Sequence, residues 1–248
     1  MTAKTKYIAF VGWVILLASC QSQPSSNSTT DSLVNKLMGS SELTPESAHP
    51  KARKLLTEDF YWSSIDESGP FGNDDGSDAF YEFKQWRAEN RNNSLTIFLD
   101  QLFSEWNFPK FNLQELDTVK IIQYMSNKAE VNAAEKEEQM ATLEEYSRKM
   151  AKEAGKEFDE EQFRKMVEAT SSSMGGRYLL GLDNAIIAVG MGQFILEGKI
   201  DKEIKSLATI AIKRELLPML IERWDGHYRG ERKEKLNKML IAFDRMEE

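Results

Sequence analysis

The sequence predicts a mainly α protein: a multi-helix globular domain with an aromatic, turn-rich N-terminal segment, behind a signal peptide and a disordered tether. Two observations support this fold class. Apolar residues recur at three- and four-residue intervals in most segments after residue 78, which is the period of an amphipathic helix. No segment strongly requires a β-sheet, and no repeat of fixed period is visible.

The chain begins with the features of a bacterial lipoprotein signal. Two early lysines precede an apolar stretch over residues 7–18, which is too short to span a bilayer comfortably. The stretch ends in LASC, a match to the lipobox in which the Cys thiol is acylated, with palmitate among the usual acyl chains, before cleavage. We expect a signal peptide over 1–19 and lipidation of Cys20.

Lipidation of Cys20 would hold the protein at a membrane of the bacterial cell envelope through its N-terminal lipid. Gln21 follows, where Asp would retain a lipoprotein in the inner membrane of enteric bacteria. This favours the outer membrane, facing the periplasm. Cys20 is the only Cys of the chain, so no intramolecular disulfide and no cysteine metal site can form.

The polar segment after Cys20 predicts a tether over 20–50, because its Ser, Thr, Asn and Pro cannot bury enough apolar surface to fold. A helical globular domain should then occupy 51–248, with a division into an aromatic subdomain over 51–117 and a bundle over 118–248 left open. Cleavage removes two lysines, which moves the net charge from -8 to -10. Such a domain attracts neither nucleic acid nor anionic lipid by its overall field, whereas a basic partner would be attracted.

The first half of the domain predicts two aromatic helices. Residues 55–75 are aromatic and turn-rich, and Asp78 can cap a first helix that runs to about Asn90. A second helix over 94–106 has the clearer apolar period, and 107–117 is expected to be a connector. The two helices should pack on each other as part of the core.

The middle of the chain predicts charged helices. Residues 118–154 form one long helix or two joined helices, whose charged middle is either a solvated face or a partner-binding helix. Asp159 should cap the next helix, which ends in the SSSMGG run.

The last third predicts a buried central helix and two further helices. The segment 177–198 is the most apolar of the mature chain, but its Asp183, Asn184 and Gln193 disfavour a membrane span. Pro218 should kink or break the following helix. The C-terminal helix is basic and amphipathic, and we expect it to dock on the acidic middle segment, with phospholipid as the alternative.

The stretch DESGPFGNDDGSD, residues 66–78, is the candidate binding loop. It fails the EF-hand pattern, because Phe71 falls on the first ligand position when Gly76 is set on the sixth. An acidic turn that caps a helix, a calcium site of another kind and a loop that recognises a partner stay open. The candidate residues are Asp66, Glu67, Phe71, Asn73, Asp74, Asp75 and Asp78.

Motifs for catalysis are missing from the sequence. There is no GxSxG elbow, HExxH or phosphate-binding glycine loop, and His227 is the only histidine outside the signal and tether as predicted. Asp66 and Glu67 lie among aromatics that could stack on sugars, which leaves glycosidic hydrolysis as an alternative. We predict a protein that is not an enzyme and has no cofactor and no metal, calcium being the less favoured exception.

The stretch from Phe60 to Trp86 resembles the YfeS-like family of uncharacterised bacterial proteins. The likeness extends over about residues 58–110 and includes the helix after 94. It implies no activity, but it does imply that the acidic loop is a feature of a family. The residues that carry it are Tyr61, Trp62, Asp66, Glu67, Pro70, Phe71, Gly72, Asp74, Gly76, Asp78 and Trp86.

Two functions remain after these observations. The favoured one is a lipid-anchored envelope protein that binds a protein partner without catalysis, in the concrete form of an immunity protein that neutralises a toxin. The alternative is an envelope hydrolase that uses paired carboxylates on glycan or lipid.

Overall fold

The computed structural model describes residues 43–126, 133–171 and 174–248. Within these ranges the chain is helical and contains no strand, so the predicted mainly α fold is confirmed. In chain order the elements are η1 (Pro45–Ser47), α2 (Pro50–Leu55), η2 (Asp59–Tyr61), α3 (Asp74–Glu89), α4 (Leu95–Glu105), α5 (Thr118–Met125), α6 (Ala133–Glu153), α7 (Glu160–Ser171), α8 (Met174–Glu197), α9 (Lys202–Glu215), α10 (Pro218–Ile221) and α11 (Gly226–Arg245).

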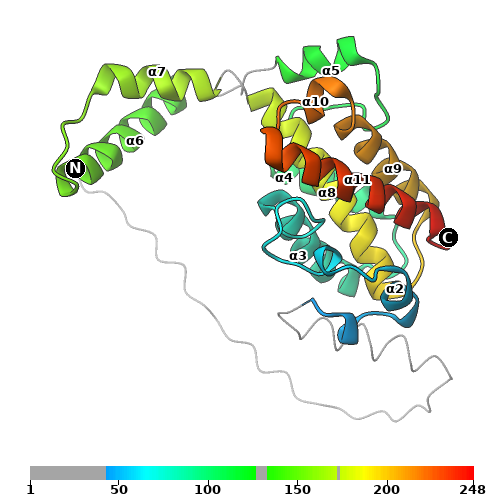
Figure 1. Ribbon diagram of the computed structural model, residues 1–248. Helices are drawn as coiled ribbons and strands as arrows, with labels where there is room; N and C mark the ends of the chain where they lie inside the picture. Colours follow the sequence, from blue (N-terminus) through cyan, green and yellow to red (C-terminus); the bar gives the residue numbers. More distant parts are fainter. Residues whose placement is uncertain (1–42, 127–132, 172–173) are drawn as a thin grey trace, which may run out of the picture.

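Helix α8 is the centre of the fold (Figure 1), as its apolar sequence predicts. By length and composition it could cross a membrane, but 94% of its most apolar window is buried inside the protein. Helices α2, α3, α5 and α9 pack around it. Its glycines allow this close approach: a Cβ on Gly192 would lie 2.5 Å from the Phe80 ring of α3.

The polar side chains of α8 are paired inside the protein. Gln193 is fully buried, and its amide donates to Asp201 at 2.9 Å while its oxygen accepts from the Asp201 backbone at 2.9 Å. At the end of the helix Glu197 accepts two hydrogen bonds from Arg87 of α3. Buried polar groups need such partners, since an unpaired one costs free energy.

The folded part begins earlier than the predicted boundary at residue 51. Residues 43–50, which we assigned to the tether, form η1 and the start of α2, and Ala48 is 2% exposed. His49 is therefore part of the fold: its backbone N–H donates to Ile195 of α8 at 2.9 Å, and its ring caps α2. Apolar contact with α8 orders a segment whose composition alone predicts disorder.

A single hydrophobic core runs through both halves of the domain, so the aromatic helices do not form a separate subdomain. Helix α3 packs directly on α8, and α4 packs on α3 and α9. Phe83 of α3 and Phe98 of α4 are buried, with ring centroids 5.8 Å apart. The predicted contact between the two aromatic helices is confirmed.

The start of α3 differs from the prediction. Asn73, not Asp78, is the N-cap, and its side-chain oxygen accepts from the Gly76 N–H at 2.8 Å. Asp78 lies inside the helix and is exposed. The helix can begin five residues earlier because Gly76 packs against Pro70, whose carbonyl oxygen would lie 2.4 Å from an added Cβ.

Helices α6 and α7 form a hairpin that stands away from the other helices (Figure 1). The predicted segment 118–154 is described as α5 and α6, and residues 127–132 lie outside the described ranges. Arg148 pairs with Glu160 at 3.0 Å across the hairpin, and Arg164 pairs with Glu144. The Asp159 cap is confirmed by its hydrogen bond from the Gln162 N–H at 2.9 Å.

The C-terminal helix docks on the N-terminal segment and not on the acidic middle helix that we predicted. Lys238 pairs with Glu58 at 2.6 Å, Lys235 pairs with Asp66, and Arg232 is buried. The aromatic segment before α3 thus supplies the acidic partners of the C-terminal helix, while the hairpin of α6 and α7 stands away from that helix. Pro218 breaks the preceding helix as predicted, because it begins α10 after α9 has ended at Glu215.

Candidate functional site

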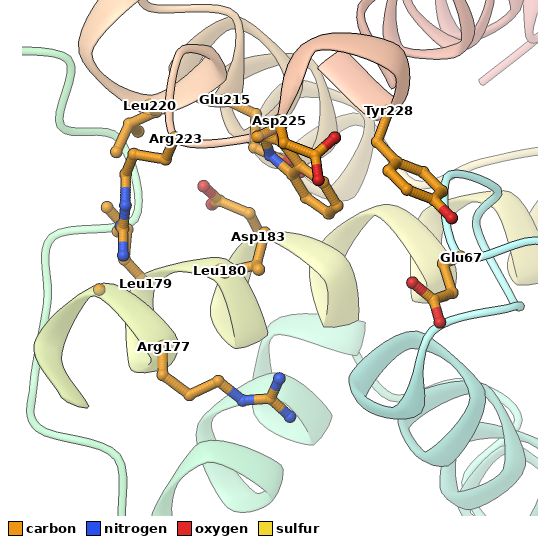
Figure 2. Close-up of a pocket in the computed structure, with 12 residues that line it drawn as sticks. Glu67, Arg177, Leu179, Leu180, Asp183, Glu215, Leu220, Arg223, Asp225 and Tyr228 are labelled. Carbon is orange, nitrogen blue, oxygen red and sulfur yellow. The ribbon is translucent and has the colours of Figure 1, made fainter. Parts of the chain in front are cut away.

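A cavity of about 480 Å³ lies where the first turns of α8 meet α9, α10, the start of α11 and the acidic loop. Its volume falls within the range of small-molecule pockets. Figure 2 shows Arg223 on one side and Glu67 with Tyr228 on the other, with Asp183 between them. The lining residues are Glu67, Gly176, Arg177, Leu179, Leu180, Asp183, Glu215, Leu220, Arg223, Trp224, Asp225 and Tyr228.

The first carboxylate at the base of the cavity, Asp183, is held by Arg214. The Arg214 Nε is 3.1 Å from each Asp183 oxygen, and its Nη2 donates to Oδ1. The Arg214 Nη1 donates to two backbone carbonyls of the connector before α5, those of Leu113 at 3.0 Å and Glu115 at 2.8 Å. Both side chains are almost fully buried. This pair joins α8, α9 and the connector.

The second carboxylate at the base, Glu215, is held by Arg232 of α11. The Arg232 Nε donates to Glu215 at 3.0 Å, and its Nη2 donates to both Glu215 oxygens. Its remaining hydrogen bonds reach Asn184 of α8 at 2.8 Å and the Ser68 carbonyl of the acidic loop at 3.1 Å. Arg232 therefore joins three helices to the loop while it is only 1% exposed.

Burial also changes the acidity of Asp183. Removal from water raises the pKa of this carboxyl to about 7, although Arg214 acts in the opposite direction. Glu215 adds a further increase and Arg232 a further decrease. A carboxyl that titrates near neutral pH at the base of a cavity is a feature of some active sites. Here both of its oxygens already accept hydrogen bonds from Arg214.

The arginines on the rim are placed differently from those at the base. Arg177 and Arg223 are exposed, and Arg177 forms an ion pair with Asp75 at 3.6 Å, longer than an ordinary hydrogen bond. Arg223 lies over Gly176, so close that an added Cβ would be 2.5 Å from its Nη1. Among the described residues no hydrogen bond or ion pair engages the Arg223 guanidinium. Its donors are available to a ligand.

The rest of the rim is acidic and aromatic. Glu67 and Asp225 are exposed carboxylates, and neither forms an ion pair or a side-chain hydrogen bond with the described part of the chain. Asp225 is the N-cap residue of α11, yet its side chain caps no helix N–H. Tyr228 is 53% exposed, and Trp224 is half-buried with Arg232 5.6 Å from its ring centroid. The rim thus presents opposite charges around apolar and aromatic walls.

The structure divides the residues of the predicted binding loop among several roles. Glu67 alone of these residues lines the cavity. Asp66 pairs with Lys235 and accepts from the Ser68 N–H at 3.1 Å. Phe71 is buried against Phe80.

The remaining loop residues belong to α3 and its cap. Asn73 is the N-cap, Asp74 and Asp75 lie in the first turn, and Asp78 follows in the helix. Burial raises the pKa of Asp75, with Arg177 and Asn184 opposing it. Negative charge in a first turn suits the helix dipole. Most of this loop therefore serves the local fold.

No group of three or more His, Cys, Asp or Glu in the described ranges is placed to hold a metal ion. Cys20, the predicted lipidation site, lies outside those ranges. His227 is exposed, with its ring next to Tyr228.

Sequence reasoning missed Arg177 in the first turn of α8, and Arg223 and Asp225 in the connection between α10 and α11, none of which carries a motif. It also missed Arg214. One signal was present, because a buried Asp183 in an apolar helix requires a cationic partner.

Comparison with known proteins gives no relative: no family model, no curated protein and no solved structure matches the chain.

Proposed function

We propose that the protein is a lipid-anchored binding protein of the bacterial cell envelope that works without catalysis. One observation carries the binding part: the carboxylates at the base of the cavity are occupied by buried arginines, while the charged groups of the rim face an open, partly apolar space. A preformed cavity with a few polar groups is typical of ligand recognition. The lipid on Cys20 and the tether supply the anchor in this proposal.

A protein partner is the second component of the proposal, in the form of an immunity protein that neutralises a toxin. The hairpin of α6 and α7 supports it. Leu143, Tyr146 and Met150 are 47%, 63% and 48% exposed, and their spacing places them on one face of α6. The negative charge of the chain would speed association with a basic toxin.

The hydrolase alternative draws support from Asp183, whose pKa of about 7 would suit a general acid. The pairing of its oxygens with Arg214 favours the binding function instead. Asp66 and Glu67, the carboxylates first proposed for this role, point to different neighbours: one pairs with Lys235 and the other lines the cavity.

The resemblance to the YfeS-like family remains a proposal as well. Its motif residues include Gly72, where an added Cβ would lie 2.1 Å from the Asp66 carbonyl oxygen, and Gly76, which packs on Pro70. A tightly folded turn of this kind gives a physical reason for a recurrent sequence.

A pull-down of the purified protein from envelope extract and culture supernatant, followed by mass spectrometry, tests the binding proposal. We expect a stoichiometric partner that is lost when Leu143, Tyr146 and Met150 are replaced by Ser. The double substitution Asp74→Ala and Asp75→Ala serves as a control for the acidic loop. Background proteins alone would contradict the protein-partner component.

Membrane attachment has its own test. The protein should partition into the detergent phase after expression in a bacterium, and Cys20→Ala should move it to the aqueous phase. Equal partition of both forms would contradict the lipid anchor.

A further inference from the structure

The rim of the cavity is polarised along its length. Arg223 and Glu67 lie on opposite sides in Figure 2, and the Arg177 guanidinium lies below and between them. Asp225 adds a second exposed carboxylate at the start of α11. At the base, Asp183 is held by Arg214 and Glu215 by Arg232, so the donors of these arginines are already engaged. Since Arg177 is paired with Asp75, the rim charges left to select a ligand are those of Arg223, Glu67 and Asp225.

The arginine side is suited to a carboxylate. A guanidinium presents a planar fork of donors that matches the two oxygens of a carboxylate. Arg223 lies against the backbone of α8 at Gly176, which leaves it little room on that side. Arg177 comes from the next residue of the same helix. Its side chain points away from Arg223 in Figure 2 and is paired with Asp75, so Arg223 is the arginine left for a ligand carboxylate.

The acidic side is suited to a cation. Glu67 and Asp225 are exposed carboxylates, and Tyr228 points toward Glu67 in Figure 2. An ammonium group would gain charge-assisted hydrogen bonds there and a contact with an aromatic ring. In Figure 2 Leu180 lies between Arg223 and Glu67, while Leu179 and Leu220 lie beside Arg223.

We propose that the cavity binds a short zwitterionic peptide, with its free carboxylate on Arg223 and its free amino group on Glu67. The apolar lining residues, Leu179, Leu180 and Leu220, would contact small or aliphatic side chains of the peptide. A cavity of about 480 Å³ suits a ligand of a few residues, and three residues span about 10 Å when extended. This inference rests on the proposed binding function and assigns its ligand class.

The test is calorimetric titration of the purified protein with Ala-Leu-Ala, alongside its N-acetylated and C-amidated forms. Dipeptides and tetrapeptides built from the same residues test which peptide length the cavity binds. We expect the free-ended peptide to bind, and each blocked form to bind about 10- to 100-fold more weakly, as expected for loss of a charge-assisted hydrogen bond.

Variants assign the two ends. Arg223→Gln should weaken binding of the free-ended peptide and leave binding of the C-amidated peptide unchanged. Glu67→Gln should weaken binding of the free-ended peptide and leave binding of the N-acetylated peptide unchanged. Arg53→Gln is the matched control, because Arg53 is an exposed arginine outside the cavity. Circular dichroism melts establish that each variant is folded.

Three results would overturn the inference: equal binding of the acetylated peptide, which indicates an anion pocket; equal binding of the amidated peptide, which indicates a cation pocket; or no binding of any free-ended peptide at millimolar concentration. The broader binding function would still stand after any of these results if envelope extract contains a ligand whose binding is lost in the rim variants. If envelope extract contains no such ligand, the proposed binding function is contradicted as well.

Discussion

The base and the rim of the cavity contain the same residue types in opposite circumstances. At the base, Arg214 and Arg232 are buried, and every nitrogen of each guanidinium donates to a carboxylate, an amide or a backbone carbonyl. At the rim, Arg177 and Arg223 are exposed. Burial makes the first pair necessary for the fold, because a buried charge without its partner is strongly destabilising. Exposure leaves the second pair available for binding.

The largest expected effect comes from breaking the base. Asp183→Ala should lower the free energy of unfolding by about 3–5 kcal/mol, because Arg214 would remain buried without its carboxylate. Urea denaturation measures this loss. The matched rim variant, Asp225→Ala, should stay within about 0.5 kcal/mol of the wild type. Similar losses in both variants would remove the distinction between base and rim.

Two adjacent glycines of α8 allow the same comparison between a packed position and a position at the rim, with a smaller expected effect on stability. A Cβ on Gly175 would lie 2.4 Å from the Met125 carbonyl oxygen, whereas the three atoms nearest to one on Gly176 all belong to the movable Arg223 side chain. Gly175→Ala should therefore cost about 1–3 kcal/mol, as overpacking does. Gly176→Ala should leave stability nearly unchanged and displace Arg223 from the cavity. Thermal melts compare the two, and a reversed order would contradict the packing described for α8.

The pH dependence of stability separates Asp183 from the other acids. Its pKa is about 7 in the folded state and 3.8 unfolded, so the folded state retains the proton more strongly between these values. The contribution of Asp183 to stability therefore falls as pH rises from about 4 to 7. Asp183→Asn should lack this decrease. Parallel stability curves for the wild type and the variant would show that Asp183 is ionised throughout.

The smallest effect on stability is expected at the rim. Arg177→Gln and Arg223→Gln should each change the free energy of unfolding by less than about 0.5 kcal/mol, because exposed charges contribute little. Their effect should appear in ligand binding instead. A loss of stability comparable to that of Asp183→Ala would assign these arginines to the fold.

The sequence predicts those features of the fold that depend on a local pattern of residues, such as the burial, the break and the caps of individual helices. The buried position of α8 follows from its apolar length together with Asp183 and Asn184, which disfavour a membrane span. The break at Pro218 and the cap at Asp159 follow from backbone chemistry. The cap at Asn73 was missed because Asp78 offers the same chemistry five residues later, and only the packing of Gly76 on Pro70 decides between them.

The cavity could not be predicted, since its parts are far apart in the chain. Glu67 precedes α3, Arg177 begins α8 and Arg223 follows α10, and nothing local relates them. The acidic loop misled for the opposite reason, because its many oxygens suggest a ligand site. In the fold Asp66 and Asn73 instead bind Lys235 and the helix N-terminus.

Arginine modification with phenylglyoxal, read by mass spectrometry with and without envelope extract, tests the separation of base and rim most directly. Arg177 and Arg223 should react quickly in the free protein and become protected by the extract, while Arg214 and Arg232 stay unreactive and Arg53 reacts equally in both conditions. Unchanged reaction rates at Arg177 and Arg223 when extract is added would contradict a ligand-binding rim.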